Sequence, residues 1–249
     1  MTIVMPRGDV EPVALQEPNG SGYVLLAATV DDRPPVAPNS RRKRALLDEI
    51  RADVRALRQS PDVIEADLFD AVLVAPGMGR ELLRRRAATV TPARFDVVVL
   101  VRTTDPQSAV ALRADSGYRH LVERMSATAT RTHEIAARNV RRIADVDHGR
   151  PSVFLFNFFY ADDPQRLVPV WHYTARWFVD HTALPDSTVL EPLAGEPADY
   201  GIINHASWPN FRTFLPHLAL RPSFRRFVLT TFAANNVAAQ PILYRRLPI

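Results

Sequence analysis

The sequence contains no cysteine, a single lysine and only nine glycines in 249 residues. Without thiols, the chain cannot form disulfides, iron–sulfur clusters or thiolate zinc sites, and it has no cysteine nucleophile. No apolar run approaches the ~20 residues that a membrane-spanning helix needs. Charged residues are scattered through the first 22 positions, which is not the pattern of a secretory signal peptide. These absences predict a cytoplasmic protein with no membrane partner.

The residues that are present indicate a globular core. The chain is 47% hydrophobic and 23% charged, and its 21 prolines predict many fixed turns. The net charge of +4 comes almost entirely from arginine, with basic runs at 41–44 and 84–86. Neither run has aromatic neighbours for base stacking, and acidic residues lie close to both. We therefore expect solvated helix faces there, and no nucleic-acid partner.

The hydrophobic pattern divides the chain into an N-terminal tail, residues 1–21, and two halves, residues 22–148 and 149–249. The first half reads as strands at 23–30, 64–75, 95–101 and 133–143, with helices after Ser40 and Asp105 and a short one at 80–87. The second half reads as strands at 153–160, 188–193, 200–206 and 237–247, with helices over 163–181 and after Trp208. Each half has the β-α-β-β-α-β order of the ferredoxin-like motif.

The halves also align in places. Residues 118–122 match 224–228, and residues 141–143 match 245–247 at a nearly equal offset. Matching element order around both pairs favours a tandem repeat.

Two of the strands decide the architecture. Residues 97–101 and 153–159 are apolar on both faces, whereas a four-stranded sheet with helices on one face should alternate. The second face must therefore be buried against the other sheet, face to face or as a closed barrel. The sequence predicts an α+β fold in which two tandem ferredoxin-like repeats form an α/β barrel within one chain.

The second half resembles the dimeric α/β-barrel superfamily, and within it the antibiotic-biosynthesis-monooxygenase-like domains. The resemblance covers roughly residues 151–247, whereas the first half shares only the element order. It is carried by Asn157-Phe158-Phe159, Pro164, Trp171, Asn204 to Trp208, Phe211, Phe214, Ser223-Phe224 and Pro241 to Tyr244. Members usually dimerise to form the barrel and tandem members can form it alone, so the resemblance implies a monomer or a homodimer.

The same resemblance implies a cofactor-independent, monooxygenase-like oxidoreductase acting on a hydrophobic, aromatic small molecule in secondary metabolism. His205 or His217 would remove a proton, and Asn157 and Asn204 would stabilise the resulting oxyanion. Trp208, Trp171 and Arg226 complete the expected substrate site. Asn204 and His205 should point to opposite faces of one strand. The residues leave open whether the chain is an enzyme at all, because a non-enzymatic binding or scaffold barrel would fill its interior with side chains.

A cofactor is not expected. The haem-degrading members resemble one another in an asparagine, a tryptophan and a histidine ligand, and here that set is split between the halves. Asn157 fits the asparagine, but His217 stands in the tryptophan's place and Arg226 in the ligand's. In the first half, His120 falls on the ligand position, so haem binding through His120 is a less favoured alternative. None of the seven histidines has metal-binding spacing, so no metal is expected.

Overall fold

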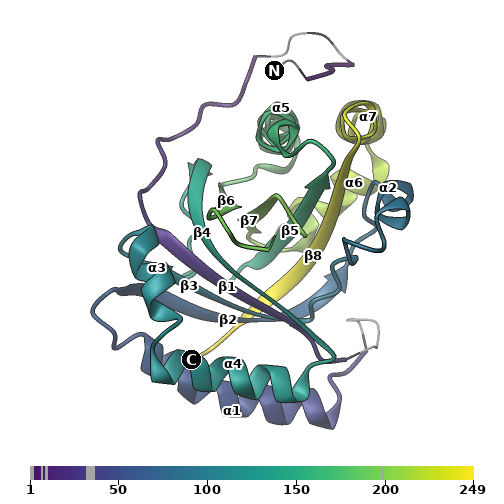
Figure 1. Cartoon of the computed structure of the whole chain (residues 1–249). Helices are drawn as coiled ribbons and strands as arrows, with labels where there is room; N and C mark the ends of the chain where they lie inside the picture. Colours follow the sequence, from purple (N-terminus) through teal and green to yellow (C-terminus); the bar gives the residue numbers. More distant parts are fainter. Residues whose placement is uncertain (1–2, 7, 9–10, 32–36, 198) are drawn as a thin grey trace.

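Strands from both halves of the chain close into one antiparallel barrel, with the helices outside it (Figure 1). The structure, a computed structural model, describes residues 3–6, 8, 11–31, 37–197 and 199–249. Around the barrel the strand order is β1-β3-β2-β8-β5-β7-β6-β4, and β4 pairs with β1 to complete the circle. The predicted α+β barrel is therefore confirmed, in its closed form.

The two halves use the same strand order. The first half contributes β1 (Gly22–Thr29), β2 (Val63–Val74), β3 (Val97–Thr103) and β4 (Arg131–Ala144), in the order β4-β1-β3-β2. The second contributes β5 (Val153–Ala161), β6 (Asp186–Pro192), β7 (Ile202–Trp208) and β8 (Val237–Leu247), in the corresponding order β8-β5-β7-β6. Two pairings join the halves, β2 with β8 and β4 with β6.

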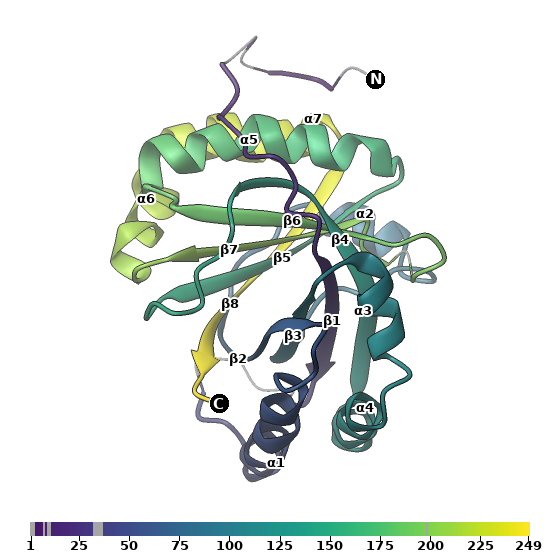
Figure 2. The same cartoon turned by 90° about the vertical axis from the view of Figure 1, so that its left-hand side faces the viewer.

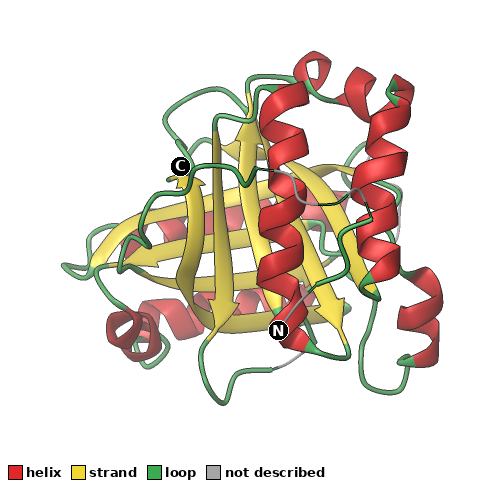
Figure 3. Ribbon diagram, turned by 90° about the horizontal axis from the view of Figure 1, so that it is seen from above, coloured by secondary structure: helices red, strands yellow, loops and turns green. Residues whose placement is uncertain are grey.

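Helices form a layer on two sides of the barrel (Figure 2). The first half carries α1 (Arg41–Leu57), α2 (Arg80–Arg85), α3 (Pro106–Leu112) and α4 (Ser116–Thr128). The second carries α5 (Leu167–Thr182), α6 (Leu215–Leu220) and α7 (Thr230–Ala234), with a π-helical turn at Phe224–Leu229 and 3-10 turns at Pro164–Arg166 and Phe211–Thr213. Figure 3 views the barrel from the side on which α5 and α7 cross the strands. Among the described residues, no helix combines the length and apolar character needed to cross a bilayer.

Side-chain caps decide where several helices begin. Ser40 accepts a hydrogen bond from the Lys43 amide and begins α1, as its position predicts. Asp105 begins α3 in the same way, through the amide of Ser108. The helical stretch expected after Asp105 is interrupted, because Asp115 caps a second helix through the amide of Tyr118. The segment that follows Asp105 is therefore two short helices rather than one.

The core has an inner and an outer part. On β5, Phe154, Phe156 and Phe158 point into the barrel, whereas Leu155 and Phe159 pack under the helices. On β3, Val98 and Leu100 face inward and Val97, Val99 and Val101 face outward. Both strands are thus buried on two faces, as their composition predicts.

The basic run at 41–44 is not simply a solvated helix face, which corrects the expectation. Arg41 and Arg44 are exposed, but Lys43 points inward and is buried. Its Nζ lies 2.7 Å from Asp70 Oδ1 and 3.0 Å from Asp96 Oδ2. The run at 84–86 is exposed, and Arg86 pairs there with Asp162.

The described part of the N-terminal segment runs along the outside of the barrel beside α5, as Figure 2 shows, and contacts both halves. Val13 is buried against the α5 side of the core, and the Gln16 amide donates to the Arg142 carbonyl at 3.0 Å. Further out, the Val4 amide donates to Asn235 Oδ1 at 2.8 Å. The described residues of this segment therefore pack along the outside of the barrel, up to the start of β1.

Candidate functional site

Aromatic side chains fill most of the barrel interior. They come from β2, β5 and β8 and from the segments leading into β3 and β7, and they are Phe69, Phe95, Phe154, Phe156, Phe158, Tyr200 and Tyr244. At one mouth they leave a cavity of ≈ 20 Å³. One water takes about 10–15 Å³ on this scale, and sites for drug-sized ligands measure about 300–1,000 Å³. In this structure the cavity has room for about one water molecule and is too small for a substrate.

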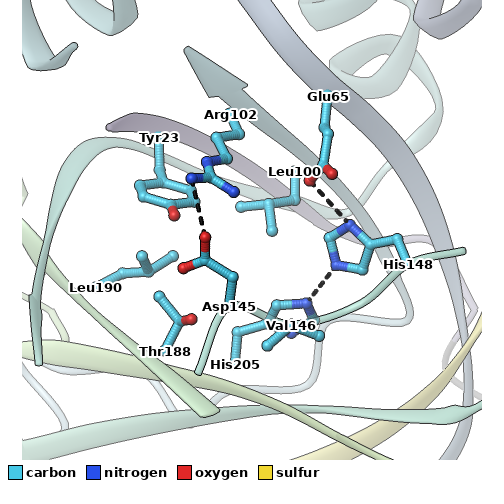
Figure 4. A pocket seen from close by; sticks show the side chains of 10 residues that line it. All are labelled: Tyr23, Glu65, Leu100, Arg102, Asp145, Val146, His148, Thr188, Leu190 and His205. Carbon is cyan, nitrogen blue, oxygen red and sulfur yellow. Dashed lines mark hydrogen bonds and ion pairs between the residues drawn. The ribbon is translucent and has the colours of Figure 1, made fainter. Parts of the chain in front are cut away.

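Polar side chains converge on this mouth, as Figure 4 shows. The cavity is lined by Tyr23, Glu65, Leu100, Arg102, Asp145, Val146, His148, Thr188, Leu190 and His205. Glu65 and Asp67 lie at alternate positions near the start of β2, on the same face as the inward Phe69. His148 comes from the connection between β4 and β5, and His205 from β7. Six parts of the chain, five strands and one connection, therefore build one site.

The two histidines are in direct contact. His148 Nε2 lies 2.8 Å from His205 Nε2. His205 Nδ1 lies 3.0 Å from the Leu155 carbonyl, which can only accept, so the His205 proton is on Nδ1 and its Nε2 accepts from His148. His148 Nδ1 in turn lies 3.0 Å from Asp67 Oδ2 and 3.5 Å from Glu65 Oε2. These contacts call for protons on both nitrogens of His148, which makes it an imidazolium.

The electrostatics agree with this assignment. Burial alone would lower the pKa of His148, but hydrogen bonding and charge from Asp67 and Glu65 outweigh burial and raise the pKa to about 9. Burial and the neighbouring His148 charge hold the pKa of His205 well below its ordinary value. At neutral pH the pair carries one positive charge, on His148, next to a neutral base.

Asp67 holds the His148 ring in place on the side opposite His205. Burial opposes ionisation of Asp67, but the close contact with His148 and the charges of His148, Arg246 and Arg58 lower its pKa. Its Oδ1 accepts from Arg58 at 2.9 Å and from Arg246 at 3.0 Å, which leaves Oδ2 for His148. Asp67 is thus held as a carboxylate.

The same atoms have the spacing of a divalent cation site. Ligand atoms of Glu65, Asp67 and His148 all lie within 4.8 Å of one another. A cation there would have to displace the proton on His148 Nδ1 and share Asp67 with two guanidinium groups. At neutral pH these charges favour the proton over a metal ion.

The predicted asparagines lie on the other face of the sheet from His205. Asn204 faces outward, as the alternation predicts, and accepts a hydrogen bond from Ser187 Oγ at 2.7 Å. Asn157 is its cross-strand partner on β5, and the Asn157 Oδ1 is buried without a hydrogen-bond partner among the described residues. The structure brings the two amides together but separates them from the histidine pair by the sheet.

The remaining predicted residues lie in the helical layer of the second half. Trp208, at the end of β7, donates to Thr182 Oγ1 at 3.1 Å and stacks on Phe214, and Trp171 is on the buried face of α5. His217 lies on α6, where it accepts from Arg221 Nε at 2.8 Å. Arg226 borders a separate surface cavity of ≈ 420 Å³, together with Trp177 and His181. None of these four predicted residues lines the mouth that holds His205.

The surroundings of His120 do not fit a haem. His120 is exposed on α4, whose buried face consists of Tyr118, Leu121 and Met125. A haem ligand needs an apolar crevice around the macrocycle, and the barrel interior behind this helix is filled by side chains. We therefore derive no chemistry through haem at His120.

Sequence reasoning missed His148, Asp67 and Glu65. The signal for the carboxylates was the alternation of Glu65 and Asp67 with Ala66 and Leu68, which places charge on an inward face. His148 lies in a connection with no periodicity, so only the closed barrel shows where its ring points.

Neither a protein-family model nor a curated protein sequence matches the chain. Among solved structures, an anthrone oxidase-like protein is 11% identical over 92% of both chains, with a TM-score of 0.66. A proposed monooxygenase from Fusobacterium nucleatum is 6% identical over 92% of both, with a TM-score of 0.54. A heme-binding protein from Thermus thermophilus is 7% identical over 96% of this chain and 95% of its own, with a TM-score of 0.48. At identities this low, the two structures with TM-scores above 0.5 show a likeness in fold alone.

Proposed function

We propose that the chain is a cofactor-independent, monooxygenase-like enzyme that acts on a small aromatic phenol or enol. The observation that carries the proposal is the contact between His148 Nε2 and His205 Nε2, backed by Asp67. It places a neutral base beside a fixed positive charge at the edge of an apolar interior. Likeness in fold to an anthrone oxidase-like protein and a proposed monooxygenase is consistent with this chemistry.

In the proposed reaction the substrate hydroxyl enters between the two rings. His205 Nε2 accepts its proton, and the His148 imidazolium donates a hydrogen bond to the oxyanion that remains. The charge of the His148 imidazolium lowers the pKa of His205, which makes His205 a weak base. The same charge would lower the pKa of the bound substrate hydroxyl, so the proton transfer to His205 stays feasible. Aromatic side chains around the mouth keep water from the carbanion form of the substrate. The carbanion carbon forms a C–O bond with dioxygen, which is the oxidant, and the proton held by His205 returns to give a hydroperoxide. Loss of water from the hydroperoxide breaks the O–O bond and leaves a ketone, so one oxygen atom ends in the product and the other in water.

The substrate must first open the mouth. The existing cavity of ≈ 20 Å³ is lined on one side by Asp145, Val146 and His148, all from the connection between β4 and β5. Movement of this connection would enlarge the cavity and would carry His148 with it. We therefore propose that substrate binding and the assembly of the histidine pair are coupled.

The test is oxygen uptake with anthrone as the substrate, in wild type and in His148→Gln, His205→Gln and His217→Gln variants. The first two should lose at least about 100-fold in rate, the contribution typical of an acid–base group. His217→Gln is the matched control, since it removes a histidine that the sequence favours but that lies on α6. Equal rates in wild type and in a His148→Gln/His205→Gln double variant would refute the proposal.

A second candidate function is a non-enzymatic binding or scaffold barrel. The filled interior favours it, and His148 and Asp67 would then be a structural ion pair. This function predicts no oxygen uptake above the spontaneous oxidation of anthrone in any variant.

We also infer that the two halves arose as a tandem repeat and that the protein works as a monomer. The shared strand order supports the repeat. Closure of the barrel within one chain supports the monomer, since no second copy is needed to cover either sheet.

A further inference from the structure

The barrel has a second mouth, at the opposite end from His148. Tyr23 and Arg102, which are cross-strand partners, line the first mouth, whereas Thr29 and Asp96 lie at the other ends of β1 and β3. The cavity at this second mouth measures ≈ 880 Å³, within the range of about 300–1,000 Å³ that small-molecule sites occupy. The strand ends form one wall and the segment that carries α2 forms the other.

A buried amide at this cavity has an unused donor. Gln240 on β8 is only 8% exposed and lines the cavity. Its Oε1 accepts from the Ala93 amide at 2.7 Å, which fixes the orientation of the side chain. Its Nε2 is buried with no hydrogen-bond partner within the described ranges. Buried amide donors are nearly always paired in native proteins, so this one is a candidate donor to a ligand oxygen. Neighbouring atoms cover Nε2, so the lining beside it must shift slightly for a ligand to reach it.

The acidic side chains around the cavity have partners, whereas two of the arginines have no carboxylate partner in the described segments. Asp96 is neutralised by Lys43 and accepts from the Val30 and Asp31 amides, and Asp31 accepts from the Ser40 amide. Arg84 pairs with Glu81. Arg80 and Arg94 also line the cavity, and within the described part of the chain neither pairs with a carboxylate. Two guanidinium groups are therefore left to attract an anion.

The rest of the lining is largely apolar and includes Val74, Met78, Leu83, Ala93, Pro241 and Ile242. We propose that this cavity binds an organic acid with a hydrophobic body, its carboxylate facing Arg80 and Arg94 and one of its oxygens accepting from Gln240 Nε2. This cavity shares no lining residue with the mouth that holds the histidine pair, so acid binding can be tested independently of the oxygenase activity.

The probe for this site is a dansyl-labelled fatty acid, dansylamino-undecanoate, with its methyl ester as the uncharged counterpart. Binding is followed by the blue shift of dansyl fluorescence. The acid should bind at least about tenfold more tightly than the ester, because the arginines contribute charge-assisted hydrogen bonds only to the acid. Equal affinities would overturn the proposal.

Variants then locate the site. Arg80→Gln/Arg94→Gln should reduce the affinity for the acid to that for the ester and leave the ester unchanged. Arg55→Gln/Arg119→Gln removes the same charge from exposed positions on α1 and α4 and should change neither affinity. Gln240→Leu, with folding checked by near-ultraviolet circular dichroism, should weaken both ligands. Retained acid binding in the Arg80/Arg94 variant would refute the site even if Gln240→Leu does not fold.

Discussion

Lys43 on α1 and Asp70 on β2 form an ion pair that solvent barely reaches. Nζ lies 2.7 Å from Oδ1, and the side chains are 2% and 1% exposed. Asp96, at the start of β3, is the second partner of the same ammonium group at 3.0 Å. The only lysine in the sequence therefore ties a helix to two strands of the barrel.

Replacement of Lys43 by methionine should destabilise the protein strongly. Met has a similar apolar stem, but it leaves Asp96 buried without its cation, while Asp70 keeps Arg245 Nη2 at 2.7 Å from its Oδ2. Removing one partner of a buried ion pair costs about 3–5 kcal/mol. Urea unfolding of Lys43→Met against Arg44→Met, an exposed neighbour, measures the difference. Equal free energies of unfolding would mean that the pair contributes nothing.

The sequence predicted the burial of the strands and the starts of two helices, but not the buried pair of Lys43 and Asp70. The apolar faces of residues 97–101 and 153–159 were enough to predict that these strands are buried on both sides, because the pattern of a strand reflects its immediate surroundings. They left open whether the two sheets pack face to face or close into a barrel. Ser40 and Asp105 identified helix starts for the same reason. Lys43 was different, since its burial depends on Asp70 and Asp96, which reach it only once β2 and β3 pair.

The site was harder to predict than the fold. His205 was identified from its strand, but its partners His148 and Asp67 lie far away in the sequence, in a loop and in the other half. Their meeting depends on barrel closure and on the path of one connection. Asn157 and Trp208 were expected from the resemblance in their motifs, and the structure places both on the helix-covered face.

Stability should fall at alkaline pH because of His148. Its pKa is raised from 6.5 in the unfolded chain to about 9 in the folded one, so its stabilising effect is complete below pH 6.5 and disappears as the pH rises through 9. The loss amounts to about 3 kcal/mol. Thermal unfolding between pH 6.5 and 9.5 should show a decline in wild type and a flatter profile in His148→Gln.

Acid should destabilise the protein through a different histidine. Burial lowers the pKa of His133 to about 4, with Asp199 opposing and Arg131 assisting the shift. Because the unfolded chain takes up this proton first, stability should decline as the pH falls from 6.5 towards 4. In His133→Gln the loss of stability below pH 6.5 should be smaller, whereas the loss of stability at alkaline pH should remain. An unchanged loss at acid pH would mean that other groups cause it.

Asn157 and Asn204 offer a matched pair for leucine substitution. The Asn157 Oδ1 is buried and unpaired, so Asn157→Leu should be neutral or stabilising by up to about 2 kcal/mol. Asn204→Leu should instead destabilise by about 1–3 kcal/mol, because it leaves the Ser187 hydroxyl without its acceptor. Differential scanning calorimetry distinguishes the two. A large loss in Asn157→Leu would point to a partner for its amide.

Gly79 should tolerate no side chain. Its φ of +77° is unfavourable for other residues, and an added Cβ would lie 2.6 Å from Ala238 Cα. Gly20 has a similar φ of +72° but no atom within 4 Å of an added Cβ. Gly20→Ala should therefore cost about 1 kcal/mol from strain alone, and Gly79→Ala a further ~1–3 kcal/mol from the clash. Equal losses would mean that the segment before α2 can lift away from β8.

The two seams that join the halves, β2 with β8 and β4 with β6, make the fold divisible. Cut in the connection between β4 and β5, the chain would give two fragments, each with a bare strand at both margins and an uncovered aromatic or aliphatic concave surface. The unpaired strand edges and the exposed apolar surfaces of the two fragments favour their association. The protein could therefore serve as a split reporter, in which the signal appears only when the two fragments bind each other.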